Sequence, residues 1–297
     1  MKCVIWRPVR SALFRLLRPA NVVTSLADVL AGAALAGGTD LGALAWLLGA
    51  TTCLYGGGIV LNDVFDRRLD AIERPERPIP SGRVSVAVAG TLGATLLLAG
   101  VGLALAANRT AGLVAAAVAG AVLLYDTAGK RHPVFGPINM GLCRGLNLML
   151  GMAILPAALS TTWPFGGLAL AYIAGVTVLS RGEVAGGRQP MAFVSLALIA
   201  GVILVLLRLA IGALPAGFGL VATLIVALLA WRVLPPFLAA ARSPAPATIR
   251  NAVRHGVLSL VLLNAALAAQ AGALGYTAAI LVTGLLAGRL ARVFAVT

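Results

Sequence analysis

Long apolar stretches recur along the whole chain and are separated by short polar connections. Each stretch is close to the roughly 20 residues that an α-helix needs to cross the ~30 Å hydrocarbon core of a bilayer. The pattern predicts an all-α, polytopic membrane protein with no soluble domain, so that residues 1–297 form a single transmembrane domain. The ten predicted spans lie near 20–38, 42–62, 84–106, 110–126, 136–157, 164–181, 190–210, 214–235, 250–272 and 276–294.

The composition agrees with this pattern. Apolar residues make up 60% of the 297 residues, and charged residues only 11%, whereas soluble domains average about 25% charged residues. The mean hydropathy is +1.00. A soluble enzyme or binding domain is therefore excluded.

The basic residues orient the predicted spans. They gather in the N-terminal tail, in every second connection and at the C-terminal end, so the positive-inside rule places the charged loops in the cytoplasm, with both termini there too if the spans number ten. We expect an integral protein of a bacterial inner membrane. The net charge of +14 then reports topology and attraction to anionic membrane lipids. No nucleic-acid partner is predicted, because no reading motif accompanies the charge.

One connection differs from the others in its charge. Residues 61–85, LNDVFDRRLDAIERPERPIPSGRVS, contain five of the chain's nine acidic residues and five of its 23 basic residues. On a helix that continues the second span, Asp63, Asp66 and Asp70 share one face at 100° per residue. Clustered carboxylates repel one another unless a cation lies among them, and hard oxygen ligands suit Mg²⁺.

The same stretch also has a simpler interpretation. A solvated helix end would carry these acids paired with neighbouring arginines. Carboxylates at the carboxyl end of a helix oppose its dipole, however, and a bound cation would relieve that conflict. The prolines and the Ser-Gly turn that follow predict an ordered loop.

The string NDVFDRRLDAIERPERPIPSGRVS resembles the first signature of the UbiA superfamily of intramembrane prenyltransferases, NDxxDxxxD followed by RPIPSGR. RPANVVTSL (18–26) resembles the family's RP-x-N start, and YDTAGKRHP (125–133) its Tyr-x-x-x-x-Lys-Arg element. The resemblance implies a bundle of usually nine spans around a central cavity. It also implies Mg²⁺-diphosphate binding by Asn62, Asp63, Asp66 and Asp70, phosphate contacts from Arg77, Lys130 and Arg131, and substrate contacts from Asn21 and Tyr125.

The second signature of the family departs from its usual form. Where DxxDxxxD is expected, this chain has TVLSRGEVAGGRQP (177–190), in which Glu183 is the only acid. The variant resembles the EboC-like branch of the superfamily. We expect Glu183 to approach the metal and Arg181 to approach the diphosphate, because guanidinium binds phosphate well.

Polar residues within the spans are few. Arg144 is the notable one, since a charge inside a span usually faces a cavity or a partner. Asn139, Arg144 and Asn147 are predicted to project toward the substrate cavity, although Arg144 could instead extend to the cytoplasmic surface. Asp28 is expected either to line the cavity or to pair with an arginine. Asn264 and Gln270 are interpreted as helix–helix hydrogen bonds.

These features predict an enzyme that uses Mg²⁺ to transfer an isoprenyl group from an isoprenyl diphosphate to an unidentified acceptor in the membrane. Two alternatives stay open. If the cation formed on ionisation meets a double bond of its own chain, the protein is a terpene cyclase. If the altered second signature has lost catalysis, it is an isoprenoid-binding or lipid-export protein. The sequence does not determine the oligomeric state.

Overall fold

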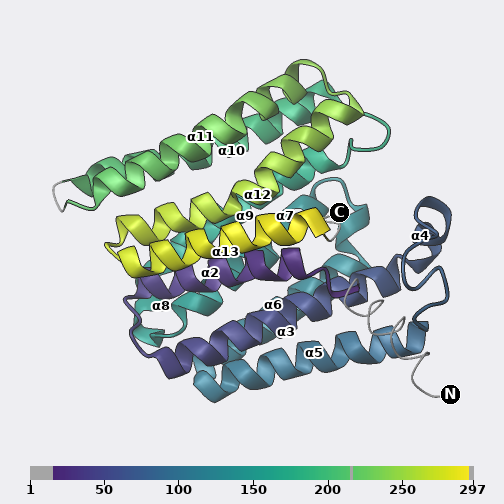
Figure 1. The fold of residues 1–297 in the computed structure, drawn as a ribbon, viewed down its shortest axis with the longest axis horizontal. Helices are drawn as coiled ribbons and strands as arrows, with labels where there is room; N and C mark the ends of the chain where they lie inside the picture. Colours follow the sequence, from purple (N-terminus) through teal and green to yellow (C-terminus); the bar gives the residue numbers. More distant parts are fainter. Residues whose placement is uncertain (1–15, 215–216, 294–297) are drawn as a thin grey trace.

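The computed structural model describes residues 16–214 and 217–293, and every regular element in these ranges is a helix. The long helices run side by side in one bundle (Figure 1). Each of the ten predicted spans corresponds to one long helix, and α4, α8 and a 3-10 turn, η1, lie in the connections. The elements are α2 (Pro19–Ala36), α3 (Leu41–Phe65), α4 (Arg67–Glu73), α5 (Val86–Ala107), α6 (Arg109–Thr127), η1 (Gly129–Arg131), α7 (Phe135–Met152), α8 (Pro156–Thr162), α9 (Pro164–Ser180), α10 (Gln189–Gly212), α11 (Gly219–Arg242), α12 (Pro246–Gln270) and α13 (Leu274–Val293).

Not all of these helices can cross a bilayer by length and hydropathy alone. Within the described residues, α3, α5, α6, α10, α11 and α12 qualify. A seventh span results if α8 and α9, which meet at an angle of 60°, count together. The apolar parts of α2 and α13, 21–36 and 274–290, are shorter. The membrane bundle is therefore established, and a count of nine or ten spans stays a prediction.

Polar side chains fix where several helices begin. Asp40 accepts hydrogen bonds from the backbone N–H groups of Gly42 and Ala43 at the start of α3. Ser85 accepts from Val88 at the start of α5, and Asn108 caps α6 in the same way. Such caps satisfy backbone donors that have no partner within the helix. They define the turns that bring consecutive helices back antiparallel.

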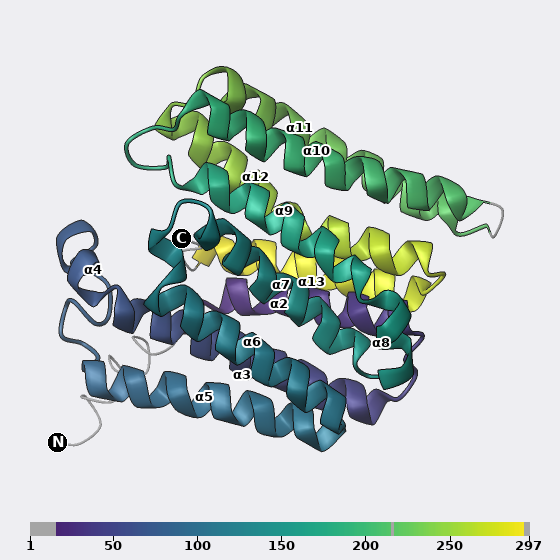
Figure 2. The ribbon, with the colours of Figure 1, turned by 180° about the vertical axis from the view of Figure 1, so that it is seen from behind.

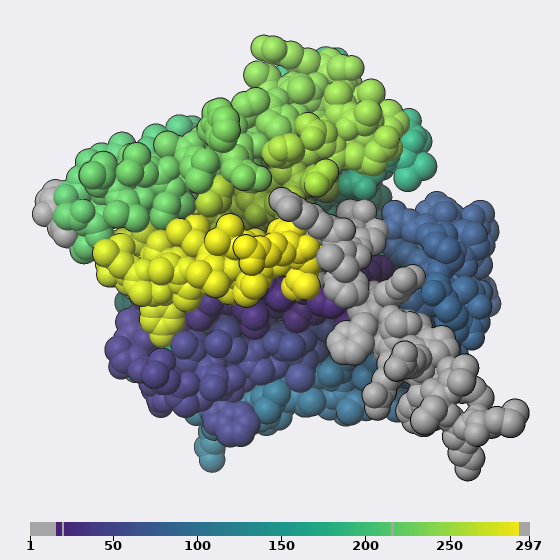
Figure 3. Space-filling view, viewed as in Figure 1, coloured from purple at the N-terminus to yellow at the C-terminus, as the bar shows by residue number. Residues whose placement is uncertain are grey.

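The bundle has two sides that meet at α2, α12 and α13. Helices α3, α5 and α6 lie on one side, and the α10–α11 hairpin lies on the other, as both ribbon views show (Figures 1 and 2). On the surface, α13 separates the α10–α11 hairpin from α2 and α3 (Figure 3). Helix α4 lies at the end of the bundle where α3, α6 and α9 finish and α2 and α12 begin (Figure 1). The charged connections thus gather at one end.

Small residues let α2 and α7 approach closely. A Cβ atom added to Gly32 would overlap the Leu148 carbonyl oxygen, and one added to Gly151 would overlap that of Val29. Close backbone approach of this kind is a common basis of helix association in membranes. The contact matters because α2 and α7 carry much of the polar lining described below.

We expect the Gly32→Ala substitution to destabilise the folded protein, because the added methyl group would force α2 and α7 apart. Overpacking of this kind costs about 1–3 kcal/mol, measurable as a lower unfolding midpoint in detergent. Gly167→Ala is the matched control, since a Cβ atom there meets nothing within 4 Å. Equal midpoints for the two variants would show that the close contact does not matter for stability.

Candidate functional site

A cavity of about 340 Å³ lies among α2, α3, α6, α7, α9 and α12. Most of its wall is apolar, with side chains such as Leu54, Val122, Met140, Ile173 and Val257. Its charged lining residues at the end near α4 are Arg18 and Asp126. The further polar lining residues are Asn21, Thr24, Asn62, Tyr125, Arg144, Asn147, Thr177 and Ser180.

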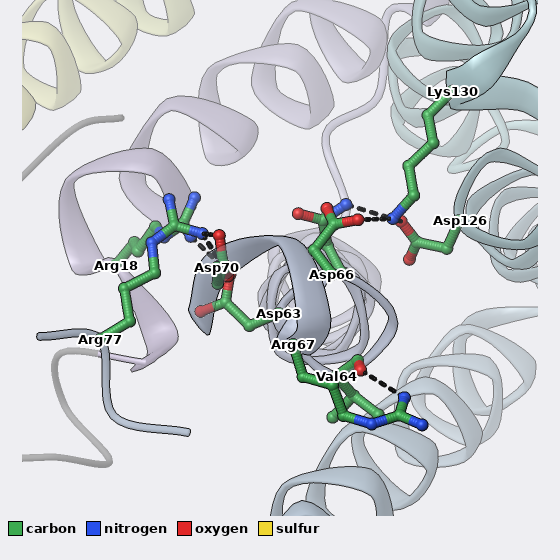
Figure 4. Close-up of polar contacts among 10 residues, drawn as sticks. Arg18, Asp63, Val64, Asp66, Arg67, Asp70, Arg77, Asp126 and Lys130 are labelled. Atoms are coloured by element: carbon green, nitrogen blue, oxygen red, sulfur yellow. Dashed lines mark hydrogen bonds and ion pairs between the residues drawn. The ribbon is translucent and has the colours of Figure 1, made fainter. Parts of the chain in front are cut away.

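Two of the predicted aspartates bind the same arginine. Arg77 Nη1 donates to Asp70 at 2.7 and 2.8 Å and to Asp63 Oδ1 at 3.4 Å (Figure 4). Asp63 Oδ1 also accepts from Arg18 Nη2 at 2.6 Å. Both carboxylates are buried, being 3% and 5% exposed. The two guanidinium groups therefore offset the charge of the two carboxylates.

The third aspartate belongs to a different cluster. Asp66 Oδ1 lies 2.6 Å from Lys130 Nζ, which is also 3.7 Å from Asp126 Oδ1. Asn62 Nδ2 donates to that same Asp126 oxygen at 2.7 Å. Figure 4 shows this cluster on the opposite side of the α3 end from Arg18 and Arg77. Asp126 Oδ2 is buried without a hydrogen-bond partner among the described residues.

A break in the helix explains why the three aspartates separate. The sequence analysis assumed one helix through residues 63–70, whereas α3 ends at Phe65 and α4 begins at Arg67. Asp66 lies between them with φ −87° and ψ 1°, away from regular helical geometry. The expected common face is therefore absent. Within the described part of the chain, no three His, Cys, Asp or Glu side chains are arranged to hold a metal ion.

Two charged residues of this site had no predicted role, Arg18 and Asp126. Arg18 has a left-handed backbone (φ 43°), the only positive φ of a non-glycine residue in the described chain, and lies directly before α2. Burial lowers the pKa of its guanidinium, and Asp63 opposes that shift. A signal for Asp126 was available: it is the only acidic residue between Glu76 and Glu183.

Two residues of the altered second signature, Thr177 and Ser180, line the cavity, and Arg181 and Glu183 contact other segments of the chain. The Arg181 guanidinium donates to three backbone carbonyl groups, those of Lys130 at 3.2 Å, His132 at 3.3 Å and Arg131 at 3.4 Å. The Glu183 carbonyl accepts from Arg250 at 2.8 Å. Burial raises the pKa of the Glu183 carboxyl, while Arg74 and Arg250 lower it. The structure thus joins Arg181 to the segment that carries Lys130, and the expected approaches of Arg181 to diphosphate and Glu183 to metal stay predictions.

The remaining predicted substrate residues divide into two groups. Asn21, Asn62, Tyr125 and Arg144 line the cavity. Asn139 does not: with its amide oriented to satisfy both partners, it donates to the Ala121 carbonyl at 3.1 Å and accepts from Tyr125 N–H at 2.9 Å. This pattern belongs to a contact that holds α7 on α6. The Arg131 side chain is exposed at the end of η1.

Arg144 does not extend to the surface. It is 5% exposed, and its Nη1 lies 3.3 Å from Asp28 Oδ2. Asp28 is fully buried and also accepts from Asn147 at 2.9 Å and from Asn264 at 2.7 Å. Of the two interpretations of Asp28, the arginine partner is the one present. Asn264 makes the helix–helix hydrogen bond that was expected of it.

Comparisons with known proteins agree with this architecture. A sequence model described as the UbiA prenyltransferase family matches residues 25–236. The chain is 35% identical over 156 residues to the digeranylgeranylglyceryl phosphate synthase of Methanopyrus kandleri, covering 52% of this chain and 57% of that protein. It is 32% identical over 151 residues to the protein of that name from Methanothrix thermoacetophila, covering 50% and 57%. The chain thus spans little more than half the length of these curated relatives.

Solved structures show the same fold. A UbiA homolog from Aeropyrum pernix superposes with a TM-score of 0.68 at 19% identity, covering 82% of this chain and 96% of that one. A UbiA homolog from Archaeoglobus fulgidus, solved with GPP and Mg²⁺ bound, superposes with a TM-score of 0.60 at 15% identity, covering 91% and 99%. At these identities the likeness concerns the fold.

We expect Arg181→Ala to loosen the segment 129–132, because three carbonyl groups lose their donor. Amide hydrogen exchange in this segment should become faster by about tenfold, as expected for the loss of one or two charge-assisted hydrogen bonds. Arg181→Lys should restore only part of the protection, since an ammonium lacks the planar fork. Arg188→Ala, at the exposed end of the same connection, is the control. Unchanged exchange in Arg181→Ala would show that other contacts hold the segment.

Proposed function

Because this chain belongs to the UbiA prenyltransferase family, we propose that it transfers an isoprenyl group from an isoprenyl diphosphate to a small or lipophilic acceptor within the membrane. One observation carries this proposal. Ion pairs adjoin one end of an apolar cavity, where the lining residues Arg18 and Asp126 pair with Asp63 and Lys130. An amphiphile with an anionic head and an apolar tail fits such a site.

Different residues would bind the diphosphate head and the isoprenyl tail of the substrate. Arg18 and Arg77 on one side of the α3 end, and Lys130 on the other, would hold the phosphate oxygens. Asn21 and Asn62 line the cavity nearby. The apolar wall would hold the isoprenyl tail and exclude water from the cation that forms when the C–O bond breaks. Preorganised charge beside a departing anion is an effective way to lower such a barrier.

The donor set suits Mg²⁺ in its chemistry. Asp63, Asp66 and Asp70 offer hard carboxylate oxygens, and Asp126 adds a buried oxygen without a hydrogen-bond partner. These are the residues that would hold the ion, although in the structure they form two separate clusters. When bound, Mg²⁺ would supply Lewis-acid stabilisation of the leaving diphosphate.

The finer assignments are also proposals. The sequence of segment 180–187 supports membership of the EboC-like branch. The curated relatives are digeranylgeranylglyceryl phosphate synthases, and the chain covers 57% of each. Their acceptor is therefore not part of the proposal. The basic connections support an inner membrane with both termini in the cytoplasm.

Turnover by the purified protein tests the proposal. Labelled geranyl diphosphate with Mg²⁺ and a membrane lipid extract should yield a heavier product that combines the prenyl group with an acceptor. A hydrocarbon or alcohol of the substrate's own carbon number would indicate cyclisation or hydrolysis, and binding without turnover would indicate a carrier. Asp66→Asn should lower the rate by about 100-fold or more, and Glu73→Gln, an exposed acid of the same connection, should leave it near that of the wild type.

The ion pairs also predict how the two ligands bind. Mg²⁺ alone would have to separate the aspartates from their cations, and so would diphosphate alone, whereas together they supply each group with a new partner. We expect each ligand to raise the affinity of the other by about 10–100-fold, within the usual range of coupling between sites. Titration calorimetry with inorganic diphosphate measures this coupling. The fit includes formation of the Mg–diphosphate complex in solution.

The Asp66→Asn variant gives this prediction a second test. Loss of the carboxylate frees Lys130 from its 2.6 Å ion pair. Metal-independent binding of diphosphate should then become tighter than in the wild type, while the binding that needs Mg²⁺ becomes weaker. Independent binding of the two ligands to the wild type would contradict the exchange of partners.

A further inference from the structure

Arg144 is a charged residue inside the cavity for which diphosphate binding gives no role. It lies nine residues into α7, about 14 Å along the helix at 1.5 Å per residue, whereas Lys130 lies in the connection before α7 and Asp63, Asp66 and Asp70 lie around the α3–α4 junction. It nevertheless lines the cavity together with Tyr55, Thr24 and Asn147. Buried charge within a membrane bundle is costly unless it is paired or used.

The Arg144 guanidinium has contacts with three side chains, but one of its nitrogens lacks a hydrogen bond. Its Nη2 donates to Thr24 Oγ1 at 3.3 Å, and its carbon lies 5.2 Å from the centre of the Tyr55 ring. Its Nη1 is near Asp28 but has no hydrogen-bond partner among the described residues. An unused donor in an environment of low dielectric constant is expensive. Arg144 itself lines the cavity, so the oxygen of a ligand held there would meet this guanidinium at close range.

The charge balance around Arg144 selects the kind of oxygen. Both oxygens of Asp28 accept hydrogen bonds from amide groups, one from Asn147 and the other from Asn264. A carboxyl group that only accepts hydrogen bonds is expected to be ionised. Asp28 and Arg144 together are therefore neutral. The other charged lining residues, Arg18 and Asp126, have counter-charges of their own. A carboxylate or phosphate placed beside Arg144 would thus be a buried charge without compensation.

From this geometry we infer that Arg144 binds an uncharged oxygen of the acceptor, a hydroxyl or carbonyl group, and that Asp28 positions Arg144 for this task. The inference rests on the proposed function, because it concerns the second substrate of the same cavity. Thr51 donates to Asn147 at 2.7 Å, so the group that orients Asp28 is itself anchored to α3. The network connects α2, α3, α7 and α12 around one donor.

Photoaffinity labelling tests the inference. Three probes share one alkyl chain with a diazirine and end in a hydroxyl, a carboxylate or a methyl group. The full-length protein in lipid nanodiscs is labelled with Mg²⁺ and inorganic diphosphate present, and labelling of the α7 peptide around Arg144 is read by mass spectrometry. The hydroxyl probe should label this peptide about tenfold more than the other two, the ratio expected for one charge-assisted hydrogen bond.

Variants separate recognition from packing. Arg144→Met should reduce labelling by the hydroxyl probe to that of the methyl probe. Asp28→Asn removes the counter-charge while it keeps the shape, so the preference should move to the carboxylate probe, a reversal that a purely structural role would not produce. Arg208→Met, an exposed arginine outside this cavity, should behave as the wild type.

Each other outcome has a definite meaning. If the wild type prefers the carboxylate probe, the subsite takes an anion and the inference is wrong. If the three probes label the wild type equally, Arg144 serves packing alone and the inference is wrong. This outcome does not depend on whether the Asp28→Asn variant folds. Diphosphate binding is measured on the same samples. Its absence with the hydroxyl preference intact would refute the proposed function and leave only the recognition of a neutral oxygen by Arg144.

Discussion

The cost of placing charge in an apolar bundle governs this structure. A charged group without a partner inside a membrane protein is expensive, so such groups are paired or face water. Asp28, Asp63, Asp66, Asp70 and Asp126 all lie within 4 Å of an arginine or lysine nitrogen. Four of these five carboxylates, all but Asp28, gather near the end of the bundle where α3 meets α4. In the described structure these ion pairs offset charge that the apolar surroundings would otherwise leave uncompensated.

The fold could be predicted from the sequence because bilayer thickness dictates helix length, and each of the ten apolar stretches became a helix. The family could be predicted because the charged string at 62–85 combines many fixed positions. The geometry at the site could not be predicted. A break of one residue at Asp66 separates carboxylates that a continuous helix would align, and local propensity gave no sign of it.

The partners of the charged residues were equally hidden from the sequence. Arg18 lies 45 residues from Asp63, and Asn264 lies 236 residues from Asp28. Such pairs follow from packing and not from spacing. Arg181 shows the same limit: its position in the sequence indicated phosphate, whereas its hydrogen bonds go to the carbonyl groups of the Lys130 segment. Arg181 thus holds the connection that carries Lys130.

The lengths of the helices, including those of the α10–α11 hairpin, affect how the bundle fits a bilayer. None of the hairpin's described residues lines the cavity. Each of its helices has 24 residues and is about 36 Å long, whereas α2 with 18 residues measures about 27 Å. The cavity helices differ among themselves as much, since α3 and α12 have 25 residues each and α9 has 17. Helices of unequal length adapt to one bilayer thickness by different tilts. A change in lipid thickness therefore reaches the cavity as well as the hairpin, through the tilt of α3 and α12.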